Sequence, residues 1–226
     1  MDPSIFILAT TILIPPFTAH LAIELARADH ARVLGPRAPI VLGVGLLAGA
    51  ANGYLPPLST LREAVFVAQP LMILGMALFL GLSAGSTARG QAFFAGAPIR
   101  PFARVGVWRA VFGGLLIAAG VSGGLPTGFF WSAGLGDIAV GLWALSMTLR
   151  GGEPSRVEFA AWNIAGLADL LHVLAVGVAN LPGFYAAHPD IERLGLLPLF
   201  GVPLFIAGHV TLLRTLARAR HTVVPA

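Results

Sequence analysis

The 226-residue chain contains neither cysteine nor lysine. Without cysteine there is no thiol catalysis, no iron–sulfur cluster and no disulfide, so the redox compartment cannot be read from the sequence. Without lysine there is no retinal Schiff base and no phosphate-binding lysine of the Walker type. All fourteen basic residues are therefore arginines. Their use together with Ala, Gly, Leu and Val suggests a bacterial source.

Charge of either sign is scarce. Only 11% of the residues are charged and 57% are hydrophobic, with a mean hydropathy of +0.85. A soluble domain carries roughly 25% charged residues, and one core buries only about three-quarters of the surface of a chain this long. Lipid must therefore be the solvent, and residues 1–226 are expected to form a single integral membrane domain. The net charge of +4 does not indicate nucleic-acid binding, because the arginines lie at the ends of apolar segments.

Long apolar segments follow one another along the chain. A bilayer-crossing helix needs about 20 mainly apolar residues, and seven segments qualify. The sequence predicts an all-α bundle of about seven transmembrane helices, at Ser4–Ala26, Ala38–Leu55, Glu63–Leu82, Val105–Val121, Thr127–Leu149, Val157–Leu181 and Leu194–Leu216.

The arginines between these segments predict the orientation. One set of connections, with the carboxyl-terminal tail, holds twelve arginines, and the opposite set holds Arg62 and Arg193. Cytoplasmic connections carry the excess of basic residues. We therefore expect the amino terminus outside and the carboxyl terminus inside a bacterial inner membrane. The longest connection, from Ser83 to about Arg104, is either an ordinary loop or a segment that lies along the membrane surface.

Ionisable side chains inside the expected spans are the candidate functional residues. Each costs at least about 2.5–3.5 kcal/mol in the bilayer on insertion scales. Asp137 and Asp169 fall near mid-depth, and His172 lies three residues after Asp169 on the same helix face, so that these two can pair. The candidate polar or ion-binding set is His20, Asp137, Asn163, Asp169, His172 and His209, with Asn52 and Gln69 as weaker members.

A short similarity joins the two aspartate segments. Residues 133–138 (AGLGDI) are similar to residues 165–170 (AGLADL), and the two helices are expected to run in opposite directions. The aspartates would then face each other across an antiparallel pair. Inverted repeats with sites at mid-membrane are typical of transporters, although Ala, Gly and Leu are common throughout this chain.

Four roles for these groups stay open. Asp–His and Asp–Arg pairs can hold helices together, and buried aspartates near histidines can transfer protons or cations. A zinc-like ion could be bound by His20, Asp137, Asp169, His172 and His209. Haem held by His20 or His172 opposite His209 is a variant of that site. No cofactor is specified by any tight ligand spacing.

Several patterns in the last 120 residues or so resemble a group of uncharacterised bacterial inner-membrane proteins. They are Trp108-Arg109, residues 123–126 (GGLP), residues 133–137 (AGLGD), residues 162–170 (WNIAGLADL) and residues 197–205 (LPLFGVPLF) followed by His209. The resemblance implies a compact helical membrane protein and carries no known activity. It singles out Asp137, Asn163, Asp169 and His209.

Three functions follow as hypotheses. The first is a small transporter or ion-coupled carrier that uses mid-membrane Asp and His. The second is an intramembrane metal- or haem-dependent enzyme. The sequence shows no serine nucleophile with an obvious partner, because Ser132 and Ser146 are expected to bond to their own backbone. The third is a non-catalytic membrane subunit or sensor. The partner implied by all three is the lipid bilayer, while a homo-oligomer, other membrane subunits and the identity of a small ligand stay open.

Overall fold

Helices account for the whole of the regular structure that can be described. The computed structural model describes residues 99–180 and 196–221, together with residue 75. The helices in these ranges are α6 (Ile99–Gly106), α7 (Trp108–Val121), α8 (Thr127–Leu149), α9 (Arg156–Ala179) and α12 (Leu196–His221).

Three helical segments are long and apolar enough to cross a membrane. Within the described residues these are Ile99–Val121, Thr127–Leu149 and Arg156–Ala179, each of 23 or 24 residues. At about 1.5 Å per residue, such a helix spans the hydrocarbon core of roughly 30 Å. The all-helical expectation is thus confirmed for these residues, and three of the expected spans coincide with membrane-length helices.

Local sequence features set the ends of these helices. The chain leaves α7 through Gly123, whose φ of +83° favours glycine, and α8 begins directly after Pro126. The Oγ atom of Ser155 accepts a hydrogen bond from the backbone N–H of Glu158 at 3.1 Å and caps α9. The Thr127–Leu149 span has the predicted bounds, and α9 differs from Val157–Leu181 by one or two residues at each end.

Of the other four expected spans, three lie outside the described residues and the seventh is matched only in part. Apart from helical Gly75, the expected spans Ser4–Ala26, Ala38–Leu55 and Glu63–Leu82 lie outside the described residues. The helix α12 covers most of the expected seventh span, but it extends to His221 and is not among the three membrane-length apolar segments.

Helix α6 corrects the predicted start of the fourth span. The sequence predicts a loop or surface segment up to about Arg104, whereas the chain is helical from Ile99. Ala103 on α6 is completely buried, and Ile99 and Phe102 pack against the same apolar cluster. The start was missed because Arg100 and Arg104 interrupt the apolar pattern. With α6 included, the span begins six residues earlier than Val105.

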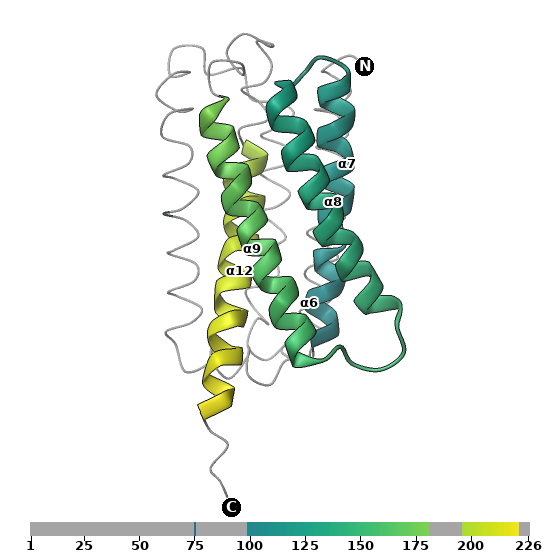
Figure 1. Cartoon of the computed structure of the whole chain (residues 1–226), viewed down its shortest axis with the longest axis vertical. Helices are drawn as coiled ribbons and strands as arrows, with labels where there is room; N and C mark the ends of the chain where they lie inside the picture. The colour runs from purple at the N-terminus through teal and green to yellow at the C-terminus, as the bar shows by residue number, and fades with distance from the viewer. Residues whose placement is uncertain (1–74, 76–98, 181–195, 222–226) are drawn as a thin grey trace, which may run out of the picture.

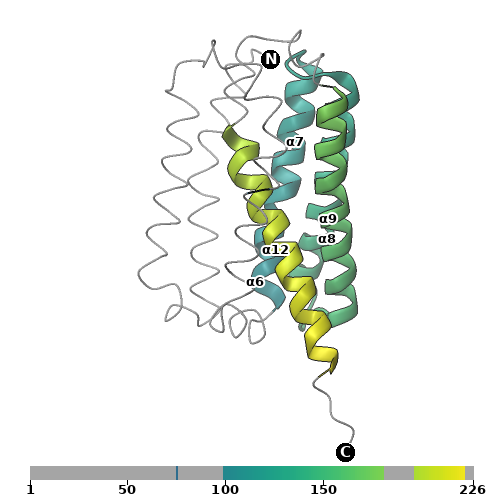
Figure 2. The same ribbon diagram turned by 90° about the vertical axis from the view of Figure 1, so that its left-hand side faces the viewer.

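The helices form one bundle (Figures 1 and 2). Helices α7 and α8 are joined by a short turn and lie side by side, while α9 contacts both α8 and α12. In Figure 1 the α8–α9 connection and the last turns of α12 lie at the same end of the bundle, opposite the α7–α8 turn. We call these the lower and the upper end.

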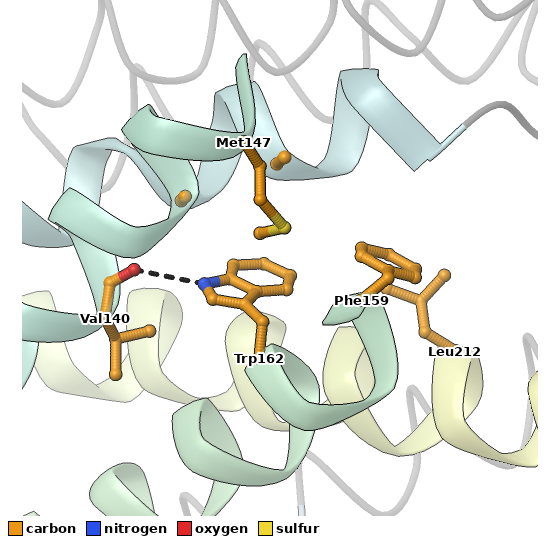
Figure 3. Packing of buried hydrophobic residues seen from close by; sticks show 7 residues of the cluster. Val140, Met147, Phe159, Trp162 and Leu212 are labelled. Atoms are coloured by element: carbon orange, nitrogen blue, oxygen red, sulfur yellow. Dashed lines mark hydrogen bonds between the residues drawn. The ribbon is translucent and has the colours of Figure 1, made fainter. Parts of the chain in front are cut away.

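An apolar cluster packs four of the described helices together (Figure 3). Its buried members come from α6, α8, α9 and α12. The Nε1–H group of Trp162 donates a hydrogen bond to the carbonyl of Val140 at 3.0 Å, and the Phe159 and Trp162 rings stack with their centroids 5.6 Å apart. The buried indole therefore satisfies its one polar group, and the ring fixes α9 against α8.

Candidate functional site

A buried arginine lies at the centre of the polar residues. The side chain of Arg109, on α7, is 1% exposed. Its Nε–H group donates to Oδ1 of Asp137 at 2.6 Å, and its Nη1–H group donates to the carbonyl of Gly166 at 3.0 Å. Its Nη2–H group donates to Oδ2 of Asp169. One guanidinium thus joins α7 to α8 and α9. We call Arg109, Asp137 and Asp169 the charge triad.

Helix register brings the members of the charge triad to one depth. Arg109 is the eleventh residue of the Ile99–Val121 segment, and Asp137 is the eleventh residue of α8. Asp169 is the fourteenth of the 24 residues of α9. Each therefore lies near the middle of a membrane-length helix.

Glycines make room for the carboxylates. A Cβ atom on Gly113 of α7 would lie 2.9 Å from the Cβ atom of Asp137, which is closer than real Cβ atoms approach. A Cβ atom on Gly136 of α8 would collide with Oδ1 of Asp169. Small residues thus let three backbones approach closely enough for the side chain of Arg109 to reach both aspartates.

The triad is unbalanced in charge when both aspartates are ionised. One guanidinium then faces two carboxylates that are 14% and 12% exposed. Burial of an ion costs several kcal/mol unless it is paired and hydrogen-bonded. The Arg109 guanidinium also lies 5.9 Å from the ring centroid of Phe205 on α12, within cation–π range. The cation is well compensated, and one negative charge is in excess.

A second polar contact ties α12 to α9. Nδ1 of His209 lies 2.8 Å from Oδ1 of Asn163, and both side chains are buried. The Nδ2–H group of Asn163 donates to the carbonyl of Phe159 at 2.7 Å, which assigns Oδ1 as the acceptor. Nδ1 of His209 must then carry the proton, and in the neutral ring Nε2 keeps a free lone pair.

His209 lies next to the charge triad. Its Nε2 atom is buried and has no hydrogen-bond partner among the described residues. A Cβ atom on Gly166 would lie 2.6 Å from this Nε2 and 3.0 Å from Nη1 of Arg109, so the two nitrogens are less than about 6 Å apart. The Trp162 ring packs edge-on against the imidazole, with centroids 5.1 Å apart. Gly166 therefore seats both the imidazole and the guanidinium against α9.

His172 and Ser132 form a third polar contact, between α9 and α8. Oγ of Ser132 is hydrogen-bonded to Nε2 of His172. The expectation that Ser132 bonds to its own backbone is therefore wrong, whereas Ser146 does so, donating to the carbonyl of Trp143 at 2.8 Å. The sequence missed this contact because it depends on the packing of two helices. The expected partner of His172, Asp169, is hydrogen-bonded to Arg109 instead.

The predicted site residues thus belong to different polar contacts that lie next to one another. Asp137 and Asp169 meet through Arg109, and Asn163 meets His209. In the part of the chain that is described, no group of three or more His, Asp or Glu side chains is placed to hold a metal ion. His20, Asn52 and Gln69 lie outside the described residues, so the expected haem pair of His20 and His209 stays a prediction.

Sequence reasoning missed Arg109 as a site residue. With the fourth span expected to begin at Val105, this arginine counts as one of the basic residues at the inner end of a helix. A helix that begins at Ile99 moves it to mid-depth. The available signal was chemical: two aspartates at mid-membrane require a buried cation, and in a chain without lysine that cation can only be arginine or histidine.

Membrane-length apolar helices that enclose a buried ion-pair cluster define the class of the molecule: a helical protein with the characteristics of a polytopic membrane protein. Within that class, the chain belongs to the family described as Domain of unknown function (DUF8737), whose model matches residues 71–217. The matched region contains the whole charge triad, His172 and the Asn163–His209 contact. No curated protein and no solved structure matches the chain.

Proposed function

We propose that the chain is a seven-span protein of the bacterial inner membrane and acts as a small proton-coupled carrier. The charge triad is its coupling site. The observation that carries the proposal is the arrangement of two carboxylates around one guanidinium at the middle of three membrane-length helices. Ionisable residues at such a depth are typical of proton relays and transport sites.

The distribution of arginines supports the proposed orientation. Four exposed arginines lie in the α8–α9 connection, at the start of α9 and in the last turns of α12: Arg150, Arg156, Arg214 and Arg218. These segments lie at the lower end of the bundle in Figure 1. Because basic residues favour the cytoplasmic side, the lower end and the carboxyl terminus face the cytoplasm.

Charge balance favours a proton as the coupled ion. A buried negative charge without a counter-ion costs several kcal/mol, and a carboxylate in that position is neutralised most simply by protonation. With one aspartate protonated, the other forms a one-to-one ion pair with Arg109. The coupling step is then the gain or loss of one proton by the Asp137–Asp169 pair. The aspartate that stays ionised forms the stronger ion pair with Arg109, and this role can pass from one aspartate to the other.

Packing around the carboxylates favours a proton over a metal cation. Gly113 lies directly against Asp137, and Gly136 lies directly against Asp169. A bound sodium or divalent ion needs several oxygen ligands at about 2–2.6 Å, and the described residues provide no group of three or more metal-binding side chains. A proton needs no additional space.

The test is a charge-displacement measurement on reconstituted vesicles. Wild-type protein is adsorbed as proteoliposomes on a solid-supported membrane and is exposed to a rapid pH jump. Uptake of a proton into the membrane interior produces a transient current. We expect Asp137→Asn and Asp169→Asn each to remove this current, because each variant leaves one carboxylate matched by Arg109.

The matched control is Glu158→Gln. Glu158 is hydrogen-bonded to Arg150 at the lower end of the bundle, so its loss removes a carboxylate outside the charge triad. This variant should keep the wild-type current. Currents of undiminished size in both aspartate variants, with gel-filtration profiles unchanged, would contradict the proposed function.

The position of the charge triad between three helices favours a second candidate function. The three charged groups come from three different helices, so they also hold α7, α8 and α9 together. In a non-catalytic membrane subunit that would be their whole role. Asp137→Asn and Asp169→Asn would then lower the melting temperature of the protein, and the wild-type protein would give no current after a pH jump.

A further inference from the structure

The contact between Ser132 and His172 lies outside the buried charge triad. Oγ of Ser132 is hydrogen-bonded to Nε2 of His172, while the His172 side chain is exposed and Ser132 is half-buried. Helices α8 and α9 are at the front of the bundle in Figure 1 and at its edge in Figure 2. A polar pair on the outer surface of membrane-length helices is costly in lipid, which makes it a candidate functional site.

The surface around this pair is open and apolar. Residues that share a helix face with His172 or Ser132, at spacings of three, four or seven positions, include four exposed alanines: Ala139, Ala168, Ala175 and Ala179. Larger exposed apolar side chains flank the pair at Trp131, Leu135 and Leu171. A molecule with an acyl chain can therefore lie along α8 and α9 and bring a polar group to the Ser132 hydroxyl.

The geometry has the chemistry of an activated nucleophile. A serine hydroxyl is a weak nucleophile until an adjacent base accepts its proton. For Nε2 of His172 to accept from Ser132, the ring must be neutral with its proton on Nδ1. The hydroxyl of Ser132 can then pass its proton directly to Nε2 of His172.

We propose that Ser132 and His172 are a nucleophile and general base that cleave carboxylic esters of acyl lipids. Oγ of Ser132 bonds to the ester carbonyl carbon as its proton passes to Nε2 of His172. The ester C–O bond breaks, and the alcohol leaves with that proton. Water then attacks the acyl-serine, giving one proton to His172, which returns it to Oγ as the fatty acid is released.

Depth along the helix favours an ester of this class. Ser132 is the sixth residue of α8, so it lies about 7.5 Å along the axis from Thr127 at the upper end. Lipid ester carbonyls lie at the edge of the hydrocarbon core, where water also reaches. This activity does not rest on proton coupling, because the pair faces outward whereas Arg109 is buried.

A covalent serine probe tests the proposal. The purified full-length protein in nanodiscs is treated with a long-chain alkyl fluorophosphonate, which forms an Oγ–P bond as fluoride leaves. We expect mass spectrometry to locate the probe on Ser132. His172→Ala should slow labelling at least about 100-fold, as expected for loss of a general base, and Ser132→Ala should abolish it. Wild-type protein should also release 4-nitrophenol from its long-chain ester, and Ser132→Ala should not.

Ser146→Ala is the matched control, because Ser146 lies on the same helix and donates to the carbonyl of Trp143. It should be labelled on Ser132 at the wild-type rate. His172→Gln replaces His172→Ala if the alanine variant loses its gel-filtration peak. No labelling of folded wild-type protein, labelling on Ser146, or equal labelling rates with and without His172 would each overturn the proposal.

Discussion

Arg109 balances most of the buried charge in the described bundle. Among the described residues it is the single cation bonded to both Asp137 and Asp169, through Nε and Nη2. A buried ion pair adds little stability compared with apolar residues, but removal of one partner strands the other. Loss of this one arginine among fourteen therefore leaves two buried carboxylates without their cation.

Replacement of Arg109 by Gln should lower the free energy of unfolding by about 3–5 kcal/mol, because two carboxylates are left without a counter-ion. The triple variant Arg109→Gln, Asp137→Asn, Asp169→Asn carries no charge at this site and should recover most of that loss. Denaturant titration in detergent micelles measures both. If the triple variant is as unstable as Arg109→Gln alone, packing and not charge explains the role of Arg109.

Gly166 should resist even the smallest side chain. A Cβ atom there would lie 2.6 Å from Nε2 of His209 and 3.0 Å from Nη1 of Arg109. Gly166→Ala must displace one of these groups, and we expect a loss of about 1–3 kcal/mol, typical of overpacking. Gly208→Ala is the control, because no other described residue beyond its own helix turn lies within 4 Å of its Cβ position. Equal melting temperatures for the two variants would contradict the close packing of His209 and Arg109 against Gly166.

At the scale of helices, the approach of α7 to α8 depends on one glycine of an adjacent pair. A Cβ atom on Gly113 would lie 2.9 Å from the backbone nitrogen of Ile138, whereas no other described residue beyond its own helix turn lies within 4 Å of a Cβ atom on Gly114. Gly113→Ala should destabilise the protein by about 1–3 kcal/mol. Gly114→Ala should be neutral or stabilising by up to about 1 kcal/mol, because alanine favours helix. Thermal unfolding of the two variants checks the contrast; a reversed order would mean that α7 and α8 pack through other residues.

Sequence patterns predict helices well where the pattern is continuous. The bounds Thr127 and Leu149 agree with α8 because a turn with Gly123 and Pro126 precedes it and Arg150 follows it. The start of α6 was not predictable by hydropathy, since two arginines interrupt the apolar run. Their cost is small because they lie near one end of the span, and Arg100 donates to the carbonyl of Arg150 at 2.9 Å.

Contacts between helices could not be predicted from the sequence in the same way. Spacing along α9 correctly places Asp169 and His172 within one helical turn, but their hydrogen-bond partners come from α7 and α8. The periodicity of one helix does not predict which face a neighbouring helix turns toward it. The pairing of Asn163 with His209, 46 positions apart, likewise requires the packing of α12 on α9. Burial cost could select these residues from the sequence, but it could not pair them.

For the molecule as a whole, the arginine bias predicts which end faces the cytoplasm. Moving Arg109 from the inner connections into the bundle reduces the inner count from twelve to eleven against two, which leaves the bias intact. The natural chain has no cysteine, so every introduced cysteine is the sole thiol. This makes the topology directly measurable.

We expect Thr127→Cys to react with a membrane-impermeant maleimide added outside intact cells. Glu153→Cys should react only after the inner membrane is opened. Thr127 is exposed at the upper end of α8, and Glu153 is exposed in the α8–α9 connection. Labelling is read by a gel shift of the purified protein. The opposite pattern would invert the orientation, and labelling of both positions from outside would exclude a membrane-spanning α8.

Infrared difference spectroscopy can detect the one exchangeable proton that we propose for the charge triad. On lowering the pH, wild-type protein should gain the C=O stretching band of a protonated carboxyl group. Asp137→Asn and Asp169→Asn should each lack this band, because either change leaves a one-to-one pair with Arg109, while Glu158→Gln should keep it. The same band in both aspartate variants, or none in the folded wild-type protein, would contradict the account.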